Sequence, residues 1–435
     1  MTVVAGGAGF AGDRIEPAVA LARSGRVDCV SLECLAERTI VQGLRARATD
    51  PEAGYDRRLR RRLTPLLPAV AAGCKVVTNL GSANPAAAAR ATARLARELG
   101  LGGLTVAAVI GDDVSAQADR VRFQRQPGSG EWLGMHAYIG LEPIADALRD
   151  GADIVITGRA ADAALFAGPA RDGLDGSPDA LAGALAVGHL LECSGQVTGG
   201  NFEAPGERPP TAGEFANLGF PLADVASDGS AEITKLDGTG GRVDRLTCTL
   251  QLLYEVHDPS RYLTPDAIVD FSQIVFESVG PDRIRVSGAR HAGIPDDLKV
   301  SGFRLSPGAV ADVEIGFAGT GALRRARTAA ETLRLRLAGL GIERFGVDVV
   351  GQDSILGPLS RSVVGDPPEA RAHVSAACVD DEIAQAVEDE VYALTLSGPS
   401  SGAGLRSERR PRVEVVDGLI ARAAVTTELV WERGR

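Results

Sequence analysis

Acidic, amide and basic side chains follow four successive apolar runs in the first half of the sequence. The runs cover residues 28–32, 75–78, 104–110 and 153–157. The polar residues that follow them are Glu33, Glu37, Asn79, Asn84, Asp112, Asp113, Arg159 and Asp162. If the runs are parallel strands, these side chains converge on one crevice at the carboxyl edge of the sheet, where open α/β sheets bind ligands. Each residue alone has a simpler explanation, because Asp and Asn commonly cap helices.

This crevice is the candidate active site, and its side chains suggest acid–base chemistry on an anionic substrate. A carboxylate can act as a general base, and an arginine can hold an anion. We predict Asp113 or Asp13 as the catalytic base and Arg159 as the anion clamp. Substrate contacts are predicted for Glu37, Asn79, Asn84 and Asp162.

A glycine-rich loop lies at the N-terminus. Residues 7–12 read Gly-Ala-Gly-Phe-Ala-Gly between a predicted strand and a predicted helix, and Glu33 lies near the end of the next strand. This context is typical of a dinucleotide site, in which glycines let the backbone approach the pyrophosphate and the acid holds the ribose. Asp13 directly follows the loop, and its carboxylate would repel a diphosphate at the helix N-terminus. Two interpretations stay open: Gly9 contacts a substrate or nucleotide, or the loop is a tight turn whose Asp13 caps the helix or takes part in the chemistry.

A third group of candidate residues lies near residue 190. His189 and Glu192 are three residues apart on one helical face, and we predict both as catalytic. His189 and Cys193 have the spacing of a nucleophile pair or of two metal ligands, but too few ligands lie nearby for a zinc site. A histidine buried in the core is the alternative.

Two glycine-rich turns further along the chain are predicted substrate contacts. Thr198, Gly199 and Gly200 form a turn whose backbone N–H groups can stabilise an oxyanion. Lys235 precedes a second turn that contains Thr239, and a lysine beside such a loop can bind phosphate or carboxylate. This second segment lacks the residue order of a phosphate-binding P-loop. A hairpin turn with a surface lysine is the alternative.

The pattern of apolar and polar residues predicts two domains. Continuous apolar strands that alternate with helices, up to about residue 225, indicate a parallel sheet covered on both faces. Asn84-Pro85 and Ser177-Pro178 are typical helix starts. From about residue 300, two successive strand–helix–strand patterns match a ferredoxin-like, split βαβ layer of α+β type. We predict an α/β domain over residues 1–290, which holds the active site, and an α+β domain over residues 291–435.

Composition and charge disfavour several classes of protein. The chain has 435 residues, a formal net charge of −11 and only 4% aromatic residues, unlike most nucleic-acid-binding or basic membrane-surface proteins. No apolar stretch is long enough to span a membrane, and the N-terminus lacks the pattern of a signal peptide. We therefore expect a cytoplasmic protein without nucleic-acid or membrane partners, and a homo-oligomer on general grounds. No ligand spacing identifies a metal, and the cofactor is unknown.

Short motifs occur along the chain in a characteristic order. They are Gly6–Asp13, Leu35–Glu37, Thr78-Asn79 with Asn84-Pro85, Gly111–Asp113, Ile154–Arg159 with Asp162, Gly188–Cys193, Gln196–Gly200, Lys235 with Gly238–Gly241, Leu253–Glu255 and Val286–Gly288. This series resembles the acyclic terpene utilization protein AtuA family over most of residues 5–300. The resemblance implies a cytosolic bacterial protein associated with degradation of branched or terpenoid acyl compounds as CoA thioesters. The chain departs from the family pattern at Ala11, where an aromatic residue is frequent, and at Leu32–Leu35, where Leu-Asp-Tyr-Leu is frequent.

Together these observations predict an enzyme that transforms a small carboxylate or an acyl-CoA thioester by lyase, hydratase or hydrolase chemistry. The candidate residues suggest the acid–base chemistry, and the resemblance suggests the substrate class. One alternative is an NAD(P)-dependent oxidoreductase that uses Gly7–Gly12 and Glu33 and therefore binds NADH or NADPH saturably. Another is a non-catalytic acyl-binding subunit, which binds its ligand tightly without changing it.

Overall fold

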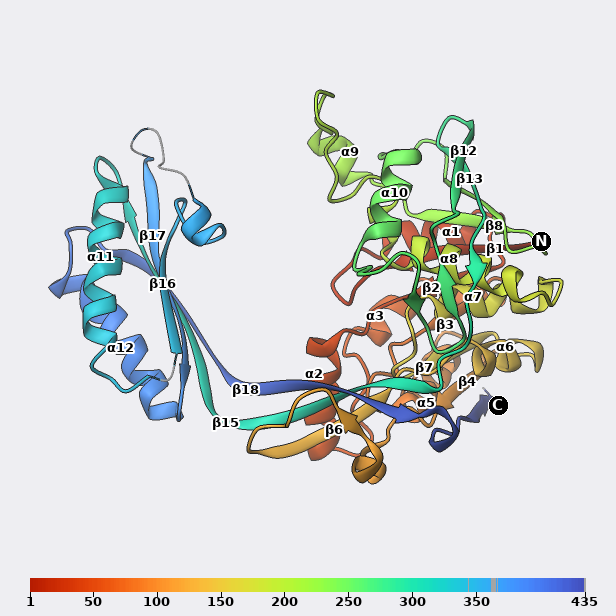
Figure 1. Ribbon diagram of the computed structural model, residues 1–435, viewed down its shortest axis with the longest axis horizontal. Coiled ribbons are helices and arrows are strands. Elements are labelled where there is room, and N and C mark those ends of the chain that lie inside the picture. The colour runs from red at the N-terminus through yellow and green to blue at the C-terminus, as the bar shows by residue number, and fades with distance from the viewer. Residues whose placement is uncertain (343, 361–364, 366, 434–435) are drawn as a thin grey trace. The chain divides into compact units, whose positions relative to one another are not determined.

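The computed structural model of the chain describes residues 1–342, 344–360, 365 and 367–433. These residues form two compact units (Figure 1). The first contains residues 1–125, 133–302 and 416–433, and the second contains residues 126–132 and the described part of 303–415. The chain passes between the units at either end of residues 126–132 and inside two long strands, β15 (Asp297–Ala318) and β18 (Ala403–Ala421). Residues 291–302 and 416–433 therefore belong to the first unit.

The first unit is built around a ten-stranded mixed sheet with the order β12-β13-β9-β8-β1-β2-β3-β7-β4-β19. Its central strands are parallel: β1 (Thr2–Ala8), β2 (Cys29–Leu32), β3 (Lys75–Thr78), β7 (Ile154–Thr157) and β4 (Thr105–Ile110). Antiparallel strands flank them: β8 (Pro221–Val225), β9 (Ala231–Lys235), β13 (Arg283–Ser287), β12 (Val275–Gly280) and β19 (Glu428–Arg433). The predicted parallel strands are present, but the sheet is mixed because the later hairpins and the C-terminal strand join its edges.

Helices cover both faces of this sheet. Successive strand residues point to opposite faces, so Val76 packs in one hydrophobic core and Val77 in the other. The helices on the Val76 side are α1 (Glu16–Arg23), α3 (Leu59–Leu63), α4 (Leu67–Ala71) and α5 (Pro85–Glu98). Those on the Val77 side are α6 (Glu142–Arg149), α7 (Ala164–Ala170), α8 (Pro178–Glu192) and α10 (Arg245–Leu253).

Two helix starts are determined by the local sequence. The side chain of Asn84 accepts a hydrogen bond from the Ala87 N–H at 3.2 Å, and Pro85 occupies the first turn of α5. Ser177 caps α8 in the same way, by accepting from the Ala180 N–H at 3.2 Å. Both helices begin as predicted, because a short polar side chain satisfies a free N–H group and proline needs none in the first turn.

The order in which the chain adds parallel strands across the sheet reverses after β4. The chain runs from β3 through α5 to β4 and returns through α6 to β7, which lies between β3 and β4. Because α5 and α6 pack on opposite faces of the sheet, these connections diverge at the carboxyl ends of the strands. Such a divergence opens a crevice, which is the usual ligand site of an open α/β sheet.

The first unit also contains shorter elements outside the large sheet. They are α2 (Glu37–Thr49), α9 (Ala212–Ala216) and a three-stranded sheet of β10 (Tyr262–Leu263), β11 (Ile268–Asp270) and β14 (Arg290–His291). Two further strands, β5 (Arg122–Phe123) and β6 (Glu131–Ala137), pair with β18 and β15. Among the described residues, no helix combines the length and the apolar character needed to cross a membrane.

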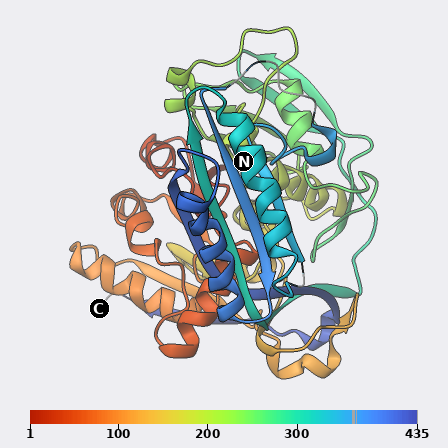
Figure 2. The ribbon, with the colours of Figure 1, turned by 90° about the vertical axis from the view of Figure 1, so that its left-hand side faces the viewer.

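The second unit has the β-α-β-β-α-β order of a ferredoxin-like layer. Between β15 and β18 lie α11 (Ala322–Leu337), β16 (Arg344–Val350), β17 (Glu369–Cys378) and α12 (Asp381–Ser397). The strands are arranged β16-β17-β15-β18, and α11 and α12 pack side by side on one face (Figure 2). Alternate residues of β17 are buried, and the intervening residues form a more polar second face.

His373 lies on this polar face between two carboxylates. Its Nδ1 is 3.2 Å from an oxygen of Asp348, and its Nε2 is 3.2 Å from an oxygen of Asp312. Partial burial lowers the pKa of His373, but the two carboxylates outweigh it, so the pKa lies above its usual value. The protonated histidine therefore stabilises the second unit fully below about pH 6.5, the ordinary histidine pKa. This contribution is lost as the pH rises through the raised pKa.

We expect the free energy of opening of β17, measured by hydrogen exchange, to fall by on the order of 1 kcal/mol between about pH 6 and about pH 9. The variant His373→Gln should lose most of this pH dependence. Hydrogen exchange followed by mass spectrometry, corrected for the intrinsic effect of pH, measures the change in peptides from β17. An equal pH dependence in the two proteins would contradict the assignment.

Candidate active site

The carboxyl ends of the parallel strands carry a cluster of buried polar side chains. Glu33 follows β2, Asn79 follows β3, Asp112 lies beyond β4 and Arg159 lies beyond β7. Each of these residues is less than a tenth exposed. The structure therefore brings together chain segments that are far apart in the sequence, at the crevice where the connections diverge.

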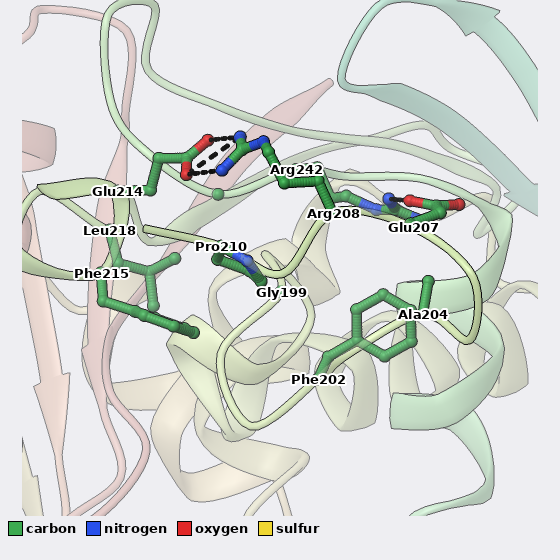
Figure 3. A pocket seen from close by; sticks show the side chains of 11 residues that line it. Gly199, Phe202, Ala204, Glu207, Arg208, Pro210, Glu214, Phe215, Leu218 and Arg242 are labelled. Carbon is green, nitrogen blue, oxygen red and sulfur yellow. Dashed lines mark hydrogen bonds and ion pairs between the residues drawn. The ribbon is translucent and has the colours of Figure 1, made fainter. Parts of the chain in front are cut away.

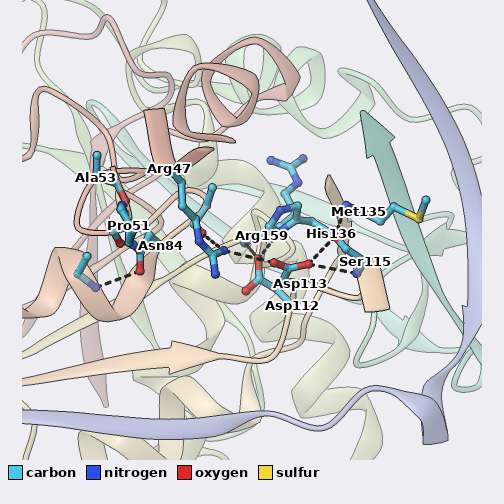
Figure 4. A network of polar contacts seen from close by, with 12 residues as sticks. Arg47, Pro51, Ala53, Asn84, Asp112, Asp113, Ser115, Met135, His136 and Arg159 are labelled. Carbon is cyan, nitrogen blue, oxygen red and sulfur yellow. Dashed lines mark hydrogen bonds and ion pairs between the residues drawn. The ribbon is translucent and has the colours of Figure 1, made fainter. Parts of the chain in front are cut away.

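Asp112 ties three segments of this cluster together. Its Oδ2 accepts hydrogen bonds from Nδ1 of His136, in β6, at 2.8 Å and from the backbone N–H of Arg159 at 2.7 Å (Figure 4). Asp112 and His136 are 2% and 1% exposed, so water does not weaken these bonds. Nε2 of His136 has no partner among the described residues. The bond from Asp112 positions the backbone that carries Arg159.

The guanidinium of Arg159 contacts Tyr138. Its central carbon lies 4.1 Å from the centroid of the Tyr138 ring, and Nη2 donates to the Tyr138 hydroxyl at 2.5 Å. Nη1 donates to the carbonyl oxygen of Leu35 and lies 4.0 Å from Oδ1 of Asp162. Burial lowers the pKa of Arg159, but Asp162 and other acidic neighbours outweigh burial and raise the pKa above its usual value. Arg159 therefore remains a cation that holds a tyrosine hydroxyl.

Glu33 is held by backbone and amide donors. Its Oε1 accepts from the Leu35 N–H at 2.8 Å and from Nδ2 of Asn79 at 3.0 Å. The Asn79 side chain accepts from the Cys34 N–H at 2.7 Å. Burial raises the pKa of Glu33, and the bond from Asn79 and the charge of Arg159 offset only part of this effect.

Asp162 is a second carboxyl group whose ionisation is suppressed. Burial raises its pKa well above the ordinary value; Arg159 lowers it, whereas the carboxyl groups of Glu33 and Glu192 raise it further. Its Oδ1 is buried and accepts no hydrogen bond from the described residues, although the side chain as a whole is 34% exposed. A partly accessible carboxyl group that favours its neutral form can donate a proton.

His189 and Glu192 form a buried pair behind this site. Nδ1 of His189 is 2.7 Å from Oε1 of Glu192, and Nε2 is 3.1 Å from the carbonyl oxygen of Leu252. Burial lowers the pKa of His189, but Glu192 and the Leu252 carbonyl outweigh it and raise the pKa above its usual value. The ring of Tyr262 lies 4.8 Å from that of His189. Both nitrogens of His189 therefore contact protein groups.

A cavity of about 510 Å³ lies beside Asp162. Tyr138, Asp162, Tyr262 and Lys299 contribute two phenols, a carboxyl group and an ammonium group to its wall. Nζ of Lys299 lies 5.1 Å from the centroid of the Tyr138 ring and 3.7 Å from Oδ1 of Asp417. The apolar wall comes from Leu263, Pro265, Ile268, Ile294, Pro295, Leu298 and Leu419. A cavity of this size, with a few polar groups in an apolar wall, is typical of a small-molecule site.

Asp113, a predicted base, lies next to Asp112 but is more exposed. Its Oδ1 accepts from the Ser115 hydroxyl at 2.6 Å, and its Oδ2 is 3.3 Å from Arg47 (Figure 4). Burial raises the pKa of Asp113, but His136, Ser115 and Arg47 together outweigh burial and lower the pKa. Asp113 does not line the cavity beside Asp162.

Asn84 and Glu37 lie near the same edge of the sheet and make different contacts. Nδ2 of Asn84 donates to the carbonyl oxygens of Pro51 and Ala53, both at 2.8 Å (Figure 4), while its Oδ1 caps α5. Glu37 begins α2, and its Oε1 accepts from the Tyr138 hydroxyl at 3.5 Å. The structure therefore links Glu37, rather than Asn84, to a residue of the cavity wall.

The N-terminal glycine loop is closed by its own aspartate. Oδ2 of Asp13 accepts from the Gly9 N–H at 3.0 Å, and Oδ1 accepts from the Arg14 N–H at 2.8 Å. A Cβ at position 9 would lie 2.6 Å from the carbonyl carbon of Cys193, so the close approach of two backbones requires glycine there. Glu33, the acid expected to hold a ribose, belongs to the buried network described above.

Polar groups of the turn after α8 make hydrogen bonds to nearby backbone carbonyls. The N–H groups of Gly199 and Gly200 donate to the carbonyl oxygens of Gln196 and Gly195 at 3.1 and 2.7 Å. The Thr198 hydroxyl likewise donates to a backbone carbonyl, at 2.6 Å. The groups predicted to stabilise an oxyanion are therefore hydrogen-bonded within the protein.

Lys235 and Thr239 close the second glycine-rich turn. Nζ of Lys235 donates to the Thr239 carbonyl at 2.9 Å and lies 3.1 Å from Oδ2 of Asp282. The Thr239 hydroxyl donates to the Leu236 carbonyl at 2.6 Å. Lys235 is only 6% exposed, and neither residue lines the cavity beside Asp162.

A second cavity, of about 440 Å³, lies next to Gly199 (Figure 3). Arg208 is 2.9 Å from Glu214, and Arg242 is paired with Glu207 in the same wall. The apolar wall comes from Phe202, Ala204, Pro210, Phe215 and Leu218. Because both arginines already have carboxylate partners, this space suits an apolar group better than an anion.

Several residues of the cavity or its support were not predicted from the sequence, among them His136, Tyr138, Tyr262 and Lys299. His136 and Tyr138 lie in a segment for which no strand or helix was predicted, and Tyr262 and Lys299 lie beyond the region of alternating strands and helices. The one available signal was that Lys299 is among only three lysines in the chain.

The six cysteines are free thiols, and burial raises the pKa of Cys193 beside His189 and raises that of Cys248 to about 12. Both therefore favour the protonated thiol over the reactive thiolate. In the described part of the chain, no group of three or more His, Cys, Asp or Glu side chains is arranged to hold a metal ion.

The first unit is thus an α/β structure with a candidate small-molecule site at the carboxyl edge of a mixed sheet. The chain belongs to the acyclic terpene utilisation family: residues 2–431 match the family described as "Acyclic terpene utilisation family protein AtuA". Membership confirms the resemblance, extends it over the second unit and implies a role in acyclic terpene utilisation. No curated protein matches the chain. A solved structure, the de novo designed protein Ferredog-Diesel, matches with a TM-score of 0.16 and 17% identity over 23% of this chain and 85% of that chain.

Proposed function

We propose that this chain is an enzyme that transforms a small carboxylate or an acyl-CoA thioester in acyclic terpene or branched acyl metabolism. The proposed chemistry is that of a lyase, hydratase or hydrolase, and the proposed setting is the cytoplasm, with the chain in a homo-oligomer. The family supports the metabolic role, and the groups around the cavity support the acid–base chemistry.

The observation that carries this proposal is the position of Asp162. It lines a cavity of about 510 Å³ and has a buried Oδ1 without a hydrogen bond from the described residues. Burial raises its pKa well above the ordinary value, so the carboxyl group keeps its proton to a higher pH than an exposed aspartate does. A carboxyl group in this state, next to space for a ligand, is suited to deliver a proton and take it back.

The rest of the wall suits an acyl substrate with one polar end. The Lys299 ammonium and the hydroxyl of Tyr262 can donate hydrogen bonds to a carboxylate or a thioester carbonyl. Burial raises the pKa of Tyr262, which therefore remains a neutral donor. The apolar residues of the wall suit a branched hydrocarbon chain, whose burial is favourable.

These groups have distinct roles in addition or elimination of water. In hydration, Asp162 delivers its proton to the carbon beside the carbonyl, water attacks the next carbon, and the carboxylate so formed takes the second proton of that water; dehydration is the reverse. Negative charge develops on the carbonyl oxygen during either reaction. Donors such as Lys299 and Tyr262 stabilise that charge, while Asp162 exchanges the proton. In a hydrolysis the same carboxyl group would protonate the leaving group. Arg159 keeps the Tyr138 hydroxyl in place through the bond at 2.5 Å.

The full-length chain should convert at least one member of a panel of acyclic terpenoid acids and their CoA thioesters. Liquid chromatography with mass spectrometry identifies the product, and a mass change of one water distinguishes hydration or dehydration from cleavage. Conversion should proceed without NADH or NADPH. Oxidation or reduction of the nicotinamide in step with the substrate would instead support the oxidoreductase. Tight binding without conversion would support the non-catalytic acyl-binding subunit.

A further inference from the structure

A separate pocket of about 290 Å³ lies beside the glycine loop. Its wall is formed by residues 12–16, which lead into α1, and by Arg58, Arg61 and Arg62 at the neighbouring helix α3. It shares no wall residue with the cavity beside Asp162. An inference from this pocket therefore goes beyond the proposed acid–base function and does not depend on it.

Positive charge predominates in this pocket. The wall includes a fourth arginine, Arg14, whereas its carboxylates are those of Asp13 and Glu16. Arginine is always protonated in proteins, so the wall carries two more positive than negative groups. The Asp56 carboxylate beside Arg58 offsets one of these charges, and the remaining excess favours an anion.

Arg62 has buried hydrogen-bond donors without acceptors, which points most clearly to a ligand. It is 3% exposed, and its Nη2 donates to the carbonyl oxygens of Ala11 and Asp13 at 2.8 and 3.0 Å. Its Nε and Nη1 are buried and have no partner among the described residues. Burying donors without acceptors costs free energy, which a bound anion would recover.

The other cations of the pocket also retain free donors. Arg58 and Arg14 lie 3.6 Å from single carboxylate oxygens of Asp56 and Glu16, distances too long for hydrogen bonds. Nη1 of Arg14 donates to the Ala216 carbonyl at 2.8 Å, which leaves its other donors. Arg61 is exposed and makes no hydrogen bond or ion pair with the described residues. No side chain caps the N-terminus of α1, whose free N–H groups also favour an anion.

We propose that this pocket binds a phosphoryl group, carried either by coenzyme A or by free phosphate. The guanidinium groups of Arg58, Arg61 and Arg62 supply the donors, because planar guanidinium groups fit phosphate oxygens well. The glycine loop contributes less than in a dinucleotide site, because the Gly9 N–H already donates to Asp13. The binding determinant is therefore the arginine cluster rather than the loop amides.

Titration of inorganic phosphate into the full-length protein at low ionic strength tests the site. Isothermal calorimetry should show saturable binding to one site per chain. Arg61→Gln should weaken binding about tenfold, the loss of one charge-assisted hydrogen bond, and Arg61→Glu should weaken it further. Arg57→Gln is the matched control, because Arg57 is also exposed and does not line the pocket. Arg62 is left intact because it braces the loop.

Coenzyme A and dephospho-coenzyme A distinguish the two sources of the phosphoryl group. If the group belongs to coenzyme A, coenzyme A binds more tightly than dephospho-coenzyme A, and the difference disappears in Arg61→Glu. If the ligand is free phosphate, inorganic phosphate binds and coenzyme A does not displace it. Saturable binding of neither inorganic phosphate nor coenzyme A, or equal affinities of Arg61→Glu and the wild-type chain, would overturn the proposal. Because the readout is binding, its failure is distinguishable from failure of the proposed reaction.

Discussion

Asp162→Asn should lower the turnover number by about 10²–10⁴-fold on whichever acid or thioester the wild-type chain converts. The amide is nearly isosteric with the carboxyl group but neither donates a proton to the substrate nor takes one back. Burial raises the pKa of Asp162, so the wild-type rate should fall at high pH as the acid ionises. That part of the pH profile should be absent from the residual activity of the variant. Steady-state kinetics over a range of pH measure both effects.

Asp296→Asn is the matched control for this experiment. Asp296 also lines the cavity, but it is exposed to solvent. Its replacement should change the turnover number by less than about twofold, because an exposed carboxylate gains little from burial or pairing. Undiminished turnover in Asp162→Asn would remove Asp162 from the mechanism. Equal losses in the two variants would show that the cavity needs negative charge rather than a proton donor.

Asp112→Ala should lower the free energy of unfolding of the first unit by about 3–5 kcal/mol. The substitution removes the acceptor for Nδ1 of His136 and for the Arg159 N–H, which are buried and hydrogen-bonded at 2.8 and 2.7 Å. A buried donor without a partner keeps its full desolvation cost. Urea unfolding followed by circular dichroism measures the loss.

Asp113→Ala is the comparison for Asp112→Ala, because it removes a neighbouring carboxylate that is exposed rather than buried. Asp113 lies 3.3 Å from Arg47, and both side chains are more than a third exposed. An exposed ion pair contributes less than about 1 kcal/mol, so this variant should unfold nearly like the wild-type chain. Similar losses in Asp112→Ala and Asp113→Ala would show that the buried contact with His136 is not what stabilises the strand ends.

Local sequence was enough to predict several elements. The caps at Asn84 and Ser177 and the apolar runs that became β2, β3, β4 and β7 depend on residues close together in the chain. The order of the motifs also identified the family, which the match over residues 2–431 confirms. Capping and alternation are local effects, so they can be predicted without knowing the fold.

The contacts of the glycine loop could not be predicted from its local sequence. The loop has the residue order of a dinucleotide site. However, the Gly9 N–H donates to the Asp13 carboxylate, and the backbone of Cys193 packs against Gly9. The pocket beside the loop is formed by arginines that lie about 45 residues further along the chain. No pattern within the loop indicates them, because only the packing of α3 against the loop brings them there.

The sequence by itself determined the family, the strand–helix alternation and the polar residues at the strand ends. The tertiary structure decided which of these residues meet a ligand-sized space. It buried Asp112 and left Asp113 exposed, and it placed Asp162 beside Tyr262 and Lys299, which are more than 95 residues away in the chain. The physical reason is that pKa values and free hydrogen-bonding groups depend on desolvation and on neighbours from other segments, which the local sequence does not specify.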